Sequence, residues 1–372
     1  MTRRPGRPRV VVAGLGDSGL LTAIHLARHA DVVGISAKPG LVSGQELGLR
    51  LARPDDWARD YWVGFDRYRG LDRVRTVHAT LTGLDRERRA VRLVTADGAR
   101  ASEPYDVLVV STGVSNGFWR RPDLETDAEV AAGLGRHHGA LAAAARIAVV
   151  GGGAAAVSSA YQVAARWPEK RVDLYFPGER ALPAHHGRVW ADVARRLAAV
   201  GVELHPGHRA VVPAEGGERI TGGPIAFSTG QAPVAADAVL WAVGRVRPNS
   251  DWLPRDLVDD DGFVRVLPTL QTPADPRIFA VGDVAATDPL RSSARNRADR
   301  LVAANIRAFL AGRALGEFRA PGRRWGSVLG YQPDGLRVYA PTGRPFRIGR
   351  RAVDLGLRPW VVRRGIYRGV RG

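Results

Sequence analysis

The sequence predicts an α/β protein in which one strand–turn–helix unit occurs twice. The first unit starts with an apolar run at residues 10–13, followed by a glycine-rich turn and by apolar residues at helical spacing between residues 17 and 30. The second starts with the apolar run at residues 147–150 and repeats this arrangement in mid-chain. The repeat predicts two Rossmann-type dinucleotide-binding domains. We expect the second domain to be inserted into the first, and a basic extension to follow at the C-terminus.

Composition limits the chemistry that the chain can carry. A sequence of 372 residues with 45% hydrophobic content is long enough for more than one core. Because the sequence contains no Cys, disulfides, thiolate metal sites and a protein dithiol relay are excluded, so electrons must travel on a bound cofactor. No apolar run approaches the roughly 18 residues that a membrane span needs, and we expect a cytoplasmic protein.

The first glycine-rich turn, Gly14-Leu15-Gly16-Asp17-Ser18-Gly19, is a complete G-x-G-x-x-G motif between a strand and a helix. Gly14 permits the tight turn, Gly16 lets the backbone approach a pyrophosphate, and Gly19 lets the helix pack on the strand. The pyrophosphate would lie at the positive end of the helix. We therefore assign Gly14, Gly16, Asp17, Ser18 and Gly19 to a cofactor-binding site.

The second turn is the variant of this motif with Ala in the last position. Either turn alone has a simpler interpretation, as a glycine-rich turn or as an Ala-rich helix start. Two of them about a domain apart indicate one resident and one mobile dinucleotide. The residues assigned to the second site are Gly151, Gly153, Ala154, Ala155 and Ala156.

Short apolar runs with turn signals predict the remaining elements. Asp97-Gly98 marks a turn, and Ala79, which follows one of these strands, is included among the cofactor-binding residues. The strands are expected at residues 74–78, 90–94, 107–110, 172–176, 202–204 and 238–242, and a last helix at residues 293–310.

The segment 272–283, which ends in Phe279-Ala280-Val281-Gly282-Asp283, resembles the second FAD signature of a large flavoprotein family. This family contains glutathione reductase, type II NADH dehydrogenases and apoptosis-inducing-factor-like proteins. In the family, the strand-end Asp, here Asp283, accepts hydrogen bonds from the ribityl chain. The segments Ser111-Thr112-Gly113 and Gly244-Arg245-Val246 resemble the family's domain-crossover segments, which adds Thr112, Gly113, Gly244 and Gly282 to the predicted site.

The resemblance, which runs from about residue 9 to residue 310, implies the domain organisation and the activity. It implies an FAD-binding domain at residues 1–118 and 246–335, an NAD(P)-binding domain at residues 119–245, and a basic extension at residues 336–372. Absence of Cys excludes the family's disulfide reductases, and the chain is most similar to single-chain NAD(P)H:quinone reductases of the type II NADH dehydrogenase and ferroptosis-suppressor-like groups. Hydride transfer from NAD(P)H to FAD, then electron delivery to a quinone-like acceptor, is implied. Because the cofactors carry this chemistry, no single catalytic residue is named.

By the same resemblance, the helix at residues 293–310 points its N-terminus at the pyrimidine edge of the flavin. Reduced flavin is anionic at that edge, so the helix dipole and backbone N–H groups would stabilise it. Ser293 is a candidate to add a hydrogen-bond donor there.

Three positions depart from the family pattern. The acid that usually takes the ribose hydroxyls is missing after residues 32–35, so Ser36 or Lys38 would have to serve at the FAD site. At the second site Phe176 replaces the acid, and Arg180 would attract a 2′-phosphate, so we expect NADPH to be preferred or tolerated. Ser158 stands where many quinone-reducing relatives carry Glu, which leaves the acceptor's identity open.

Basic residues are concentrated at the C-terminus. The sequence has 55 basic and 37 acidic residues, a formal net charge of +18, and residues 337–371 hold ten Arg and one acid. Because these Arg alternate with aromatic and aliphatic residues, we expect the extension to bind an anionic membrane surface, on the inner face of the cell membrane. A packed extension and a disordered basic tail are the alternatives. Gly349, Gly356, Pro359 and Gly365 argue against one long helix.

Two other functions compete with quinone reduction. One is an NAD(P)H-dependent reductase of a small electron-transfer protein such as ferredoxin, because a basic surface suits acidic partners. The other is a redox-sensing nucleic-acid-binding flavoprotein, which the charge alone suggests. No nucleic-acid-binding motif supports this second function, and nucleic acid is not an expected partner.

The pairs His137-His138 and His185-His186 predict no metal site, because neighbours on a helix point about 100° apart. The sequence leaves the oligomeric state open.

Overall fold

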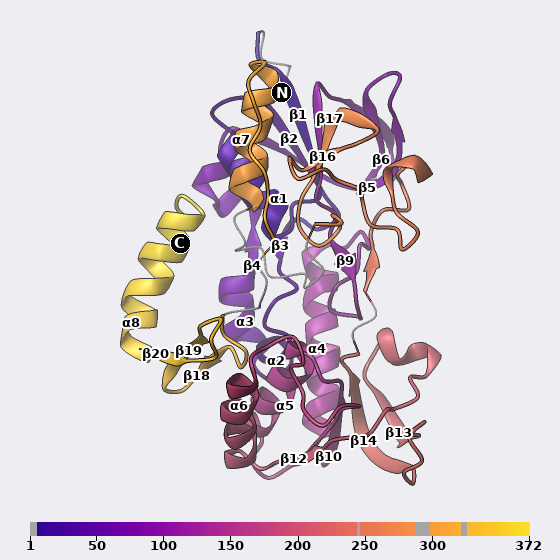
Figure 1. The fold of residues 1–372 in the computed structure, drawn as a ribbon, viewed down its shortest axis with the longest axis vertical. Helices are drawn as coiled ribbons and strands as arrows, with labels where there is room; N and C mark the ends of the chain where they lie inside the picture. The colour runs from indigo at the N-terminus through magenta and orange to yellow at the C-terminus, as the bar shows by residue number, and fades with distance from the viewer. Residues whose placement is uncertain (1–5, 244–245, 288–297, 321–325) are drawn as a thin grey trace.

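Two β-sheets, one above the other along the long axis of the molecule, organise the fold (Figure 1). The computed structural model describes residues 6–243, 246–287, 298–320 and 326–372. The first sheet has eight strands in the order β16-β17-β8-β1-β2-β5-β6-β7, and the second has five in the order β12-β11-β10-β14-β13. Helices pack on both sheets, so the predicted α/β class is confirmed.

The first sheet is parallel at its centre and becomes antiparallel at both edges. The central strand is buried on both faces, because Val10 and Val12 join one core while Val11 and Ala13 join another. The first of these cores also holds the buried faces of helices α1 (Asp17–Leu26) and α7 (Ala298–Leu310). The strands are β1 (Arg9–Ala13), β2 (Asp31–Ser36), β5 (Val74–Asp85), β6 (Ala90–Thr95), β7 (Arg100–Pro104), β8 (Val107–Val110), β16 (Gln271–Thr272) and β17 (Asp275–Ala280).

The second sheet has the same parallel centre, and β13 adds an antiparallel edge. Ile147 and Val149 face the core that contains helices α5 (Ala154–Arg166) and α6 (Gly187–Ala199), whereas Ala148 and Val150 face a separate core on the other side. The strands are β10 (Arg146–Val150), β11 (Arg171–Tyr175), β12 (Val202–His205), β13 (Thr221–Ile225) and β14 (Val234–Trp241).

The chain leaves the first sheet after β8 and returns to it at β16, so the second sheet is inserted within the first unit. Where the chain crosses in each direction, β9 (Val114–Ser115) pairs with β15 (Arg247–Pro248). Helix α4 (Asp127–Ala143) begins just after the first crossing with a capping box between Thr126 and Glu129. The insertion of one domain in the other is confirmed, and the domain boundaries stay predictions.

Smaller elements lie outside the two main sheets, and one of them, helix α2 (Leu47–Ala52), packs on the second domain. Helix α2 lies so close to α5 that a Cβ on Gly48 would be 2.4 Å from the carbonyl oxygen of Ser158. The other elements are β3 (Gly40–Val42), α3 (Pro54–Tyr61), β4 (Trp62–Gly64), and the 3₁₀ turns η1 (Phe65–Arg67), η2 (Arg69–Leu71), η3 (Ala214–Gly217) and η4 (Arg255–Leu257).

The C-terminal segment packs on both domains. It contains a three-stranded sheet, β18 (Tyr331–Gln332), β19 (Gly335–Tyr339) and β20 (Pro345–Gly349), then the helical turn α8 (Arg350–Ala352) and the π-helix η6 (Val353–Ile366). On the second domain, the Tyr339 hydroxyl donates to Asp192 at 2.8 Å. On the first domain, Arg363 pairs with Asp60 at 3.1 Å, and the rings of Tyr68 and Tyr367 meet edge to face at 5.2 Å.

The expectation that glycine and proline would prevent one long helix in this segment is wrong. Helical structure runs without interruption from Arg350 to Ile366 and includes Gly356 and Pro359 (Figure 1). The intrinsic cost is about 1 kcal/mol for Gly and about 3 kcal/mol for Pro. Packing against the first domain, including an Arg358–Asp60 pair at 3.2 Å, offsets this cost.

Most predicted strands form within one or two residues of the expected bounds, with two differences. Strand β5 continues to Asp85, and β14 starts at Val234, because each extension pairs with an antiparallel neighbour. Strand β7 was not expected, because Arg-Ala-Ser-Glu-Pro has no apolar pattern; it forms at a sheet edge with most of its residues exposed. Helix α1 ends at Leu26 rather than near residue 30. The expected helix start at residues 293–297 lies outside the described residues.

Candidate functional site

A cavity of about 1460 Å³ lies where the two domains and the C-terminal segment meet. Its walls come from the first glycine-rich turn, the end of β2, the crossing segments, the start of α5 and the C-terminal sheet. Ten of the predicted residues named for the FAD site line it, together with Ala79 of β5. These lining residues are Gly14, Gly16, Asp17, Ser18, Ser36, Lys38, Ala79, Thr112, Gly113, Gly282 and Asp283.

The first glycine-rich turn has the shape that a pyrophosphate needs. Gly14 has a φ of 100°, and a Cβ on it would be 2.5 Å from the carbonyl oxygen of Ser111. A Cβ on Gly19 would be 1.8 Å from the carbonyl oxygen of Gly14, so helix and strand meet only because Gly19 has no side chain. Gly16 has nothing within 4 Å of its Cβ position and faces the open cavity. The three glycines therefore fit their predicted roles at an FAD site.

The second turn is built in the same way. Gly151 has a φ of 140°, and a Cβ on it would be 2.3 Å from the carbonyl oxygen of Ala242. Gly153 is exposed with nothing within 4 Å of its Cβ position. Ala154 and Ala155 line the cavity at the start of α5, while Ala156 is buried behind them. This turn fits a dinucleotide that enters from solvent, and it opens on the same cavity as the first turn.

Asp283 is paired with a residue that the sequence did not point to. Arg120 Nη2 donates to Asp283 Oδ2 at 2.6 Å, and both side chains line the cavity. Asp17 lies nearby and accepts a hydrogen bond from Ser43 Oγ at 3.0 Å. Burial raises the pKa of Asp17, and this rise is opposed by the Ser43 hydrogen bond and by the charge of Arg120.

An acid from a distant part of the sequence, Glu125, lies beside the end of β2. Lys38 Nζ pairs with the carboxylate of Glu125 and donates to the carbonyl oxygen of Asp123. The Glu125 backbone N–H donates to the carbonyl oxygen of Ala37 at 3.0 Å, which holds Glu125 beside the strand end. Lys38 and Glu125 both line the cavity. No local signal in the sequence identifies Glu125, because its position depends on the path of the crossing segment.

The crossing segments are tied together by Asn249. Its backbone N–H donates to the carbonyl oxygen of Gly113, and its side-chain amide donates to the carbonyl oxygen of Thr112 at 2.9 Å. The Thr112 hydroxyl donates to the carbonyl oxygen of Asn249 at 2.7 Å. The predicted partners Thr112 and Gly113 therefore hold the two crossings in register. Gly244, predicted at the second crossing, and Ser293, predicted near the flavin, lie outside the described residues.

At the second site, Phe176 and Arg180 have different environments. Phe176 is buried and packs edge to face on Trp190, with ring centroids 5.5 Å apart, so it is a core residue that closes the end of β11. Arg180 is exposed, and its Nη1 lies 3.4 Å from the carbonyl oxygen of His185. Arg180 does not line the cavity, whereas His185 does.

One wall of the cavity combines a buried cation with an uncharged histidine. Arg50 Nη1 donates to the carbonyl oxygen of Trp119 at 2.9 Å, its guanidinium lies 4.7 Å from the ring centroid of Trp57, and burial lowers its pKa to about 10. The rings of His137 and Phe118 pack with centroids 3.9 Å apart and planes inclined by 32°. Burial, with added repulsion from Arg50, lowers the pKa of His137 to about 4, so this side chain is neutral at pH 7. Arg50, Phe118 and His137 were not among the predicted site residues.

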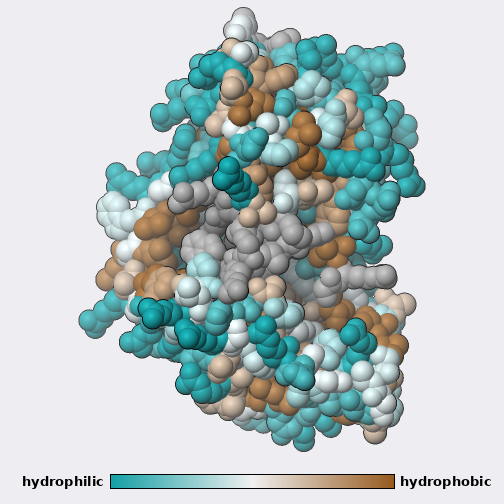
Figure 2. Space-filling view, in the orientation of Figure 1, coloured by the Kyte–Doolittle hydropathy of each residue, from teal (hydrophilic) through white to brown (hydrophobic). Residues whose placement is uncertain are grey.

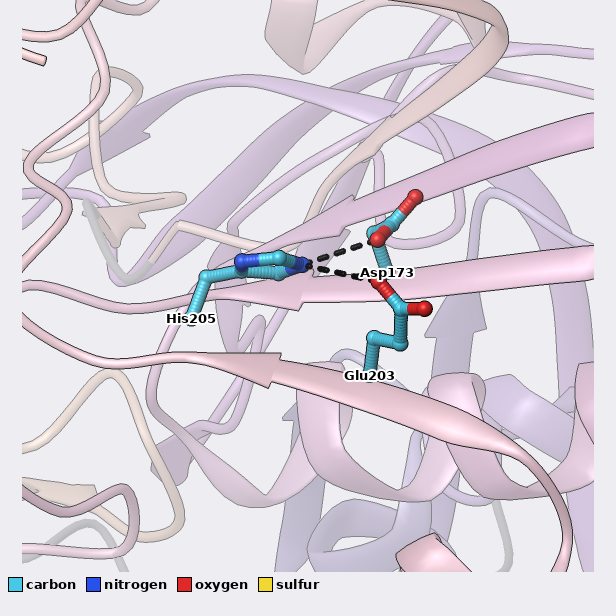
Figure 3. Close-up of side chains that lie close together, drawn as sticks. All are labelled: Asp173, Glu203 and His205. Carbon is cyan, nitrogen blue, oxygen red and sulfur yellow. Dashed lines mark hydrogen bonds and ion pairs between the residues drawn. The ribbon is translucent and has the colours of Figure 1, made fainter.

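A cluster of Asp173, Glu203 and His205 lies on the second sheet (Figure 3). His205 Nε2 is 2.8 Å from Asp173 Oδ1, and Arg146 and Arg171 approach Asp173 Oδ2 at 3.3 and 3.2 Å. Arg171 also pairs with Glu203 at 2.7 Å. The two guanidinium groups balance the two carboxylates, so we interpret the cluster as a structural ion-pair network rather than a metal site.

The family model of the pyridine nucleotide-disulphide oxidoreductases matches residues 8–305. A curated relative, the FAD-dependent oxidoreductase FVFD30 of Flammulina velutipes, is 27% identical over 245 residues, which are 64% of this chain and 73% of the relative. Within the described residues, no helix combines the length and apolar character needed to cross a membrane.

Solved structures share the fold at low sequence identity. The reduced CoADR-RHD protein of Bacillus anthracis has a TM-score of 0.66 at 17% identity, covering 91% of this chain, which spans 62% of that protein's length. The ferredoxin reductase of the CYP199A2 system from Rhodopseudomonas palustris has a TM-score of 0.60 at 21% identity, covering 86% of this chain and 79% of that one. With two glycine-rich turns on one cavity and a family match over most of its length, the chain belongs to the pyridine nucleotide-disulphide oxidoreductases and is an oxidoreductase that uses FAD and NAD(P)H.

Proposed function

We propose that the protein oxidises NAD(P)H and delivers the electrons to an apolar, quinone-like acceptor. FAD, when bound, supplies the redox chemistry by accepting electrons from the nicotinamide and passing them on. The sequence has no Cys, so the second half of the reaction takes place without a dithiol on this chain. The acceptor must therefore reach the cofactor cavity itself, or approach its edge.

The observation that carries this proposal is an apolar wall on the cofactor cavity. In the C-terminal sheet, Leu336 of β19 lies opposite Ile348 of β20, and Val338 lies opposite Phe346. All four residues line the cavity, as does Leu357 of η6. Alternate residues of a strand lie on the same face of a sheet, so these two cross-strand pairs form one apolar face. A planar apolar molecule would be bound by such a face beside the polar cofactor site.

The chain's own residues have positioning roles in this proposal. The turns at Gly16 and Gly153 would hold the two pyrophosphates at the starts of α1 and α5. Arg120 and Asp283 would orient the ribityl part of FAD, and Glu125 would accept hydrogen bonds from its ribose. The neutral imidazole of His137 would offer a hydrogen bond to a carbonyl-bearing acceptor in the cavity.

Kinetics with two acceptors test the apolar wall. The variant Val338→Asn should raise the KM for menadione about tenfold, the effect of about 1.4 kcal/mol in binding. The rate with ferricyanide, a hydrophilic acceptor, should stay unchanged. Val211→Asn, at a residue 55% exposed and away from the cavity lining, is the matched control. An equal loss with both acceptors, or no loss with menadione, would contradict the quinone proposal.

A second proposed function is reduction of a small acidic electron-transfer protein. The formal net charge of +18 favours association with acidic partners, and a ferredoxin reductase shares the fold. A screen of NADPH oxidation with menadione and with ferredoxin separates the two proposals. Turnover with ferredoxin that falls steeply with added salt, together with slow menadione reduction, would favour the protein acceptor.

Peripheral membrane association is a further part of the proposal. Leu355, Trp360 and Val361 of η6 are 72%, 60% and 51% exposed, and Figure 2 shows apolar residues on the surface in the region of this helix, at the left of the view. Arg351 and Arg364 of the same helical segment are exposed, whereas Arg358 and Arg363 pair with Asp60. An apolar helix face beside basic residues suits an anionic lipid surface.

The membrane test uses the full chain, because the segment packs on both domains. Wild-type protein should co-sediment with phosphatidylglycerol vesicles, and the variant carrying Leu355→Gln, Trp360→Gln and Val361→Gln should remain in the supernatant. Equal co-sedimentation of the two proteins would reject this membrane face.

A further inference from the structure

A second, smaller cavity lies apart from the cofactor site. It has a volume of about 370 Å³ and lies between α1, α7 and the end of η6. None of its lining residues is shared with the larger cavity. At about 1.5 Å per helical residue, His25 lies roughly 12 Å along α1 from the first glycine-rich turn. The residues that line it are His25, His29, Arg300, Ala303, Arg307, Gly365 and Arg368.

The acid nearest to this pocket is already engaged. His25 Nε2 lies 3.0 Å from Asp299 Oδ2, and Asp299 is only 4% exposed and does not line the pocket. Arg368 Nη2 lies 3.4 Å from His25 Nδ1, and its Nη1 lies 3.4 Å from the carbonyl oxygen of Ile24. His25 therefore contacts both Asp299 of α7 and Arg368 of the C-terminal segment, and it links these two elements.

The remaining lining side chains leave a positive charge without a counter-ion. Over the described ranges, no carboxylate lines the pocket, and Arg300, Arg307 and Arg368 form no ion pair. Arg307 Nε donates to the carbonyl oxygen of Ala303, in its own helix, at 3.4 Å. The pKa of His29 is lowered by burial and by the charges of Arg307, Arg368, Arg7 and Arg28, which is the effect that a concentration of cations has on a neighbouring base.

We propose that this pocket binds a phosphate-bearing anion, from either a soluble phosphate compound or the headgroup of an anionic lipid. Guanidinium groups bind phosphate oxygens through paired, charge-assisted hydrogen bonds. Here the groups come from two elements, Arg300 and Arg307 from α7 and Arg368 from the C-terminal segment. A bound phosphate would bridge these elements and hold the C-terminal segment on the first domain. The proposal is independent of the acceptor and of the apolar face of η6.

Titration of the FAD-loaded protein with pyrophosphate tests this binding. The double variant Arg307→Gln/Arg368→Gln should weaken pyrophosphate binding at least about tenfold in calorimetry, because the variant loses two charged donors to the phosphate oxygens. Arg88→Gln/Arg100→Gln removes the same charge from two exposed arginines of the β5–β7 region and is the control. It should bind pyrophosphate as the wild type does. Arg307→Gln/Arg368→Lys, which keeps the positive charge at residue 368, should bind pyrophosphate more tightly than Arg307→Gln/Arg368→Gln. This comparison separates a binding role from a folding defect.

Vesicles distinguish the two sources of the phosphate. If a lipid headgroup is the ligand, phosphatidylglycerol vesicles should bind the wild type and the Arg88→Gln/Arg100→Gln control, and they should bind the pocket variant less. Pyrophosphate should then compete. If a soluble compound is the ligand, pyrophosphate binding should depend on the pocket while vesicle binding does not. The proposal is overturned if neither probe binds, or if the pocket variant and the control bind both probes equally.

Discussion

Arg120 Nη2 lies 2.6 Å from Asp283 Oδ2, so a guanidinium from the first domain crossing holds the carboxylate that follows β17. This contact connects two segments that are 163 residues apart. Both side chains are partly exposed to the cofactor cavity. The pair places a fixed acceptor and a fixed donor on the wall where FAD is expected.

Removal of the charge on Asp283 should weaken FAD binding. For Asp283→Asn we expect the FAD dissociation constant to rise about 10- to 100-fold, because a hydrogen bond to a charged group contributes about 1.5–3 kcal/mol. This constant is measured from the fluorescence of the FAD that is released when the FAD-loaded protein is diluted. Asp260→Asn, at an exposed loop residue, is the control. If Asp283→Asn retained FAD as tightly as this control, the assignment of Asp283 would be wrong.

Substitutions at two glycines of the first turn should have different effects, one on folding and the other on FAD binding. Gly19→Ala places a methyl group 1.8 Å from a backbone oxygen, and we expect a loss of about 3 kcal/mol in the free energy of unfolding. Gly16→Ala has open space at its Cβ position, so it should fold normally and bind FAD more weakly. Urea unfolding of the two apoproteins checks the first effect. Equal stabilities would show that Gly19 does not set the packing of α1 on β1.

Both glycine-rich turns and the strand end at Asp283 were predictable, because each is a local pattern with a fixed structural context. Arg120 and Glu125 were not, although both line the cavity. They belong to the segment that crosses between the domains, whose path is fixed by the β9–β15 pair and by Asn249 rather than by its own sequence. Arg50 and His137 were missed for the same reason, since the places of α2 and α4 are set by long-range packing, of α2 on α5 and of α4 on α2 and α3.

Asp173 should contribute to stability at neutral pH. Its carboxylate is completely buried, whereas its partners Arg146 and Arg171 are 35% and 52% exposed. Asp173→Asn should therefore cost about 1.5–3 kcal/mol, the contribution of a hydrogen bond to a charged group. Thermal unfolding compared with Glu203→Gln, at an exposed partner of the same network, measures the difference. Similar small losses for both variants would contradict a structural role for the buried carboxylate.

The same network predicts how the stability of the protein changes as the pH falls. Burial alone would raise the pKa of Asp173, but hydrogen bonds and charge from His205 and Arg171 outweigh it, so the pKa lies below its ordinary value of 3.8. The stabilisation is therefore fully present above pH 3.8 and is lost as the pH falls below it, through the folded-state pKa. Asp173→Asn should lose less stability than the wild type over that interval. A parallel decline of the two proteins would show that Asp173 does not contribute to acid unfolding.

Arg180 should contribute to the choice of nicotinamide cofactor. Phe176 is buried in the core at the end of β11, so no carboxylate at that position repels a 2′-phosphate, while Arg180 is exposed nearby. For Arg180→Gln we expect the KM for NADPH to rise about tenfold, equivalent to about 1.4 kcal/mol, with the KM for NADH unchanged. Steady-state kinetics with both cofactors measure this ratio. A large NADH preference in the wild type would reject the NADPH prediction.

The C-terminal segment shows why local propensity alone predicted the wrong structure. Gly356 and Pro359 disfavour a helix in isolation, yet the helical segment continues through both. Asp60 accepts contacts from Arg358 and Arg363, and Tyr68 packs on Tyr367. These partners are some 300 residues away in sequence, so their contribution could not be weighed before the fold was known.

The visible absorption spectrum of the purified protein, followed during addition of NADPH or NADH and then menadione, tests the central claim most directly. The account predicts a protein-bound FAD spectrum that bleaches with one of the nicotinamides under anaerobic conditions and returns on addition of menadione. A colourless protein that cannot be reconstituted with FAD, or a bound flavin that neither nicotinamide reduces, would contradict it.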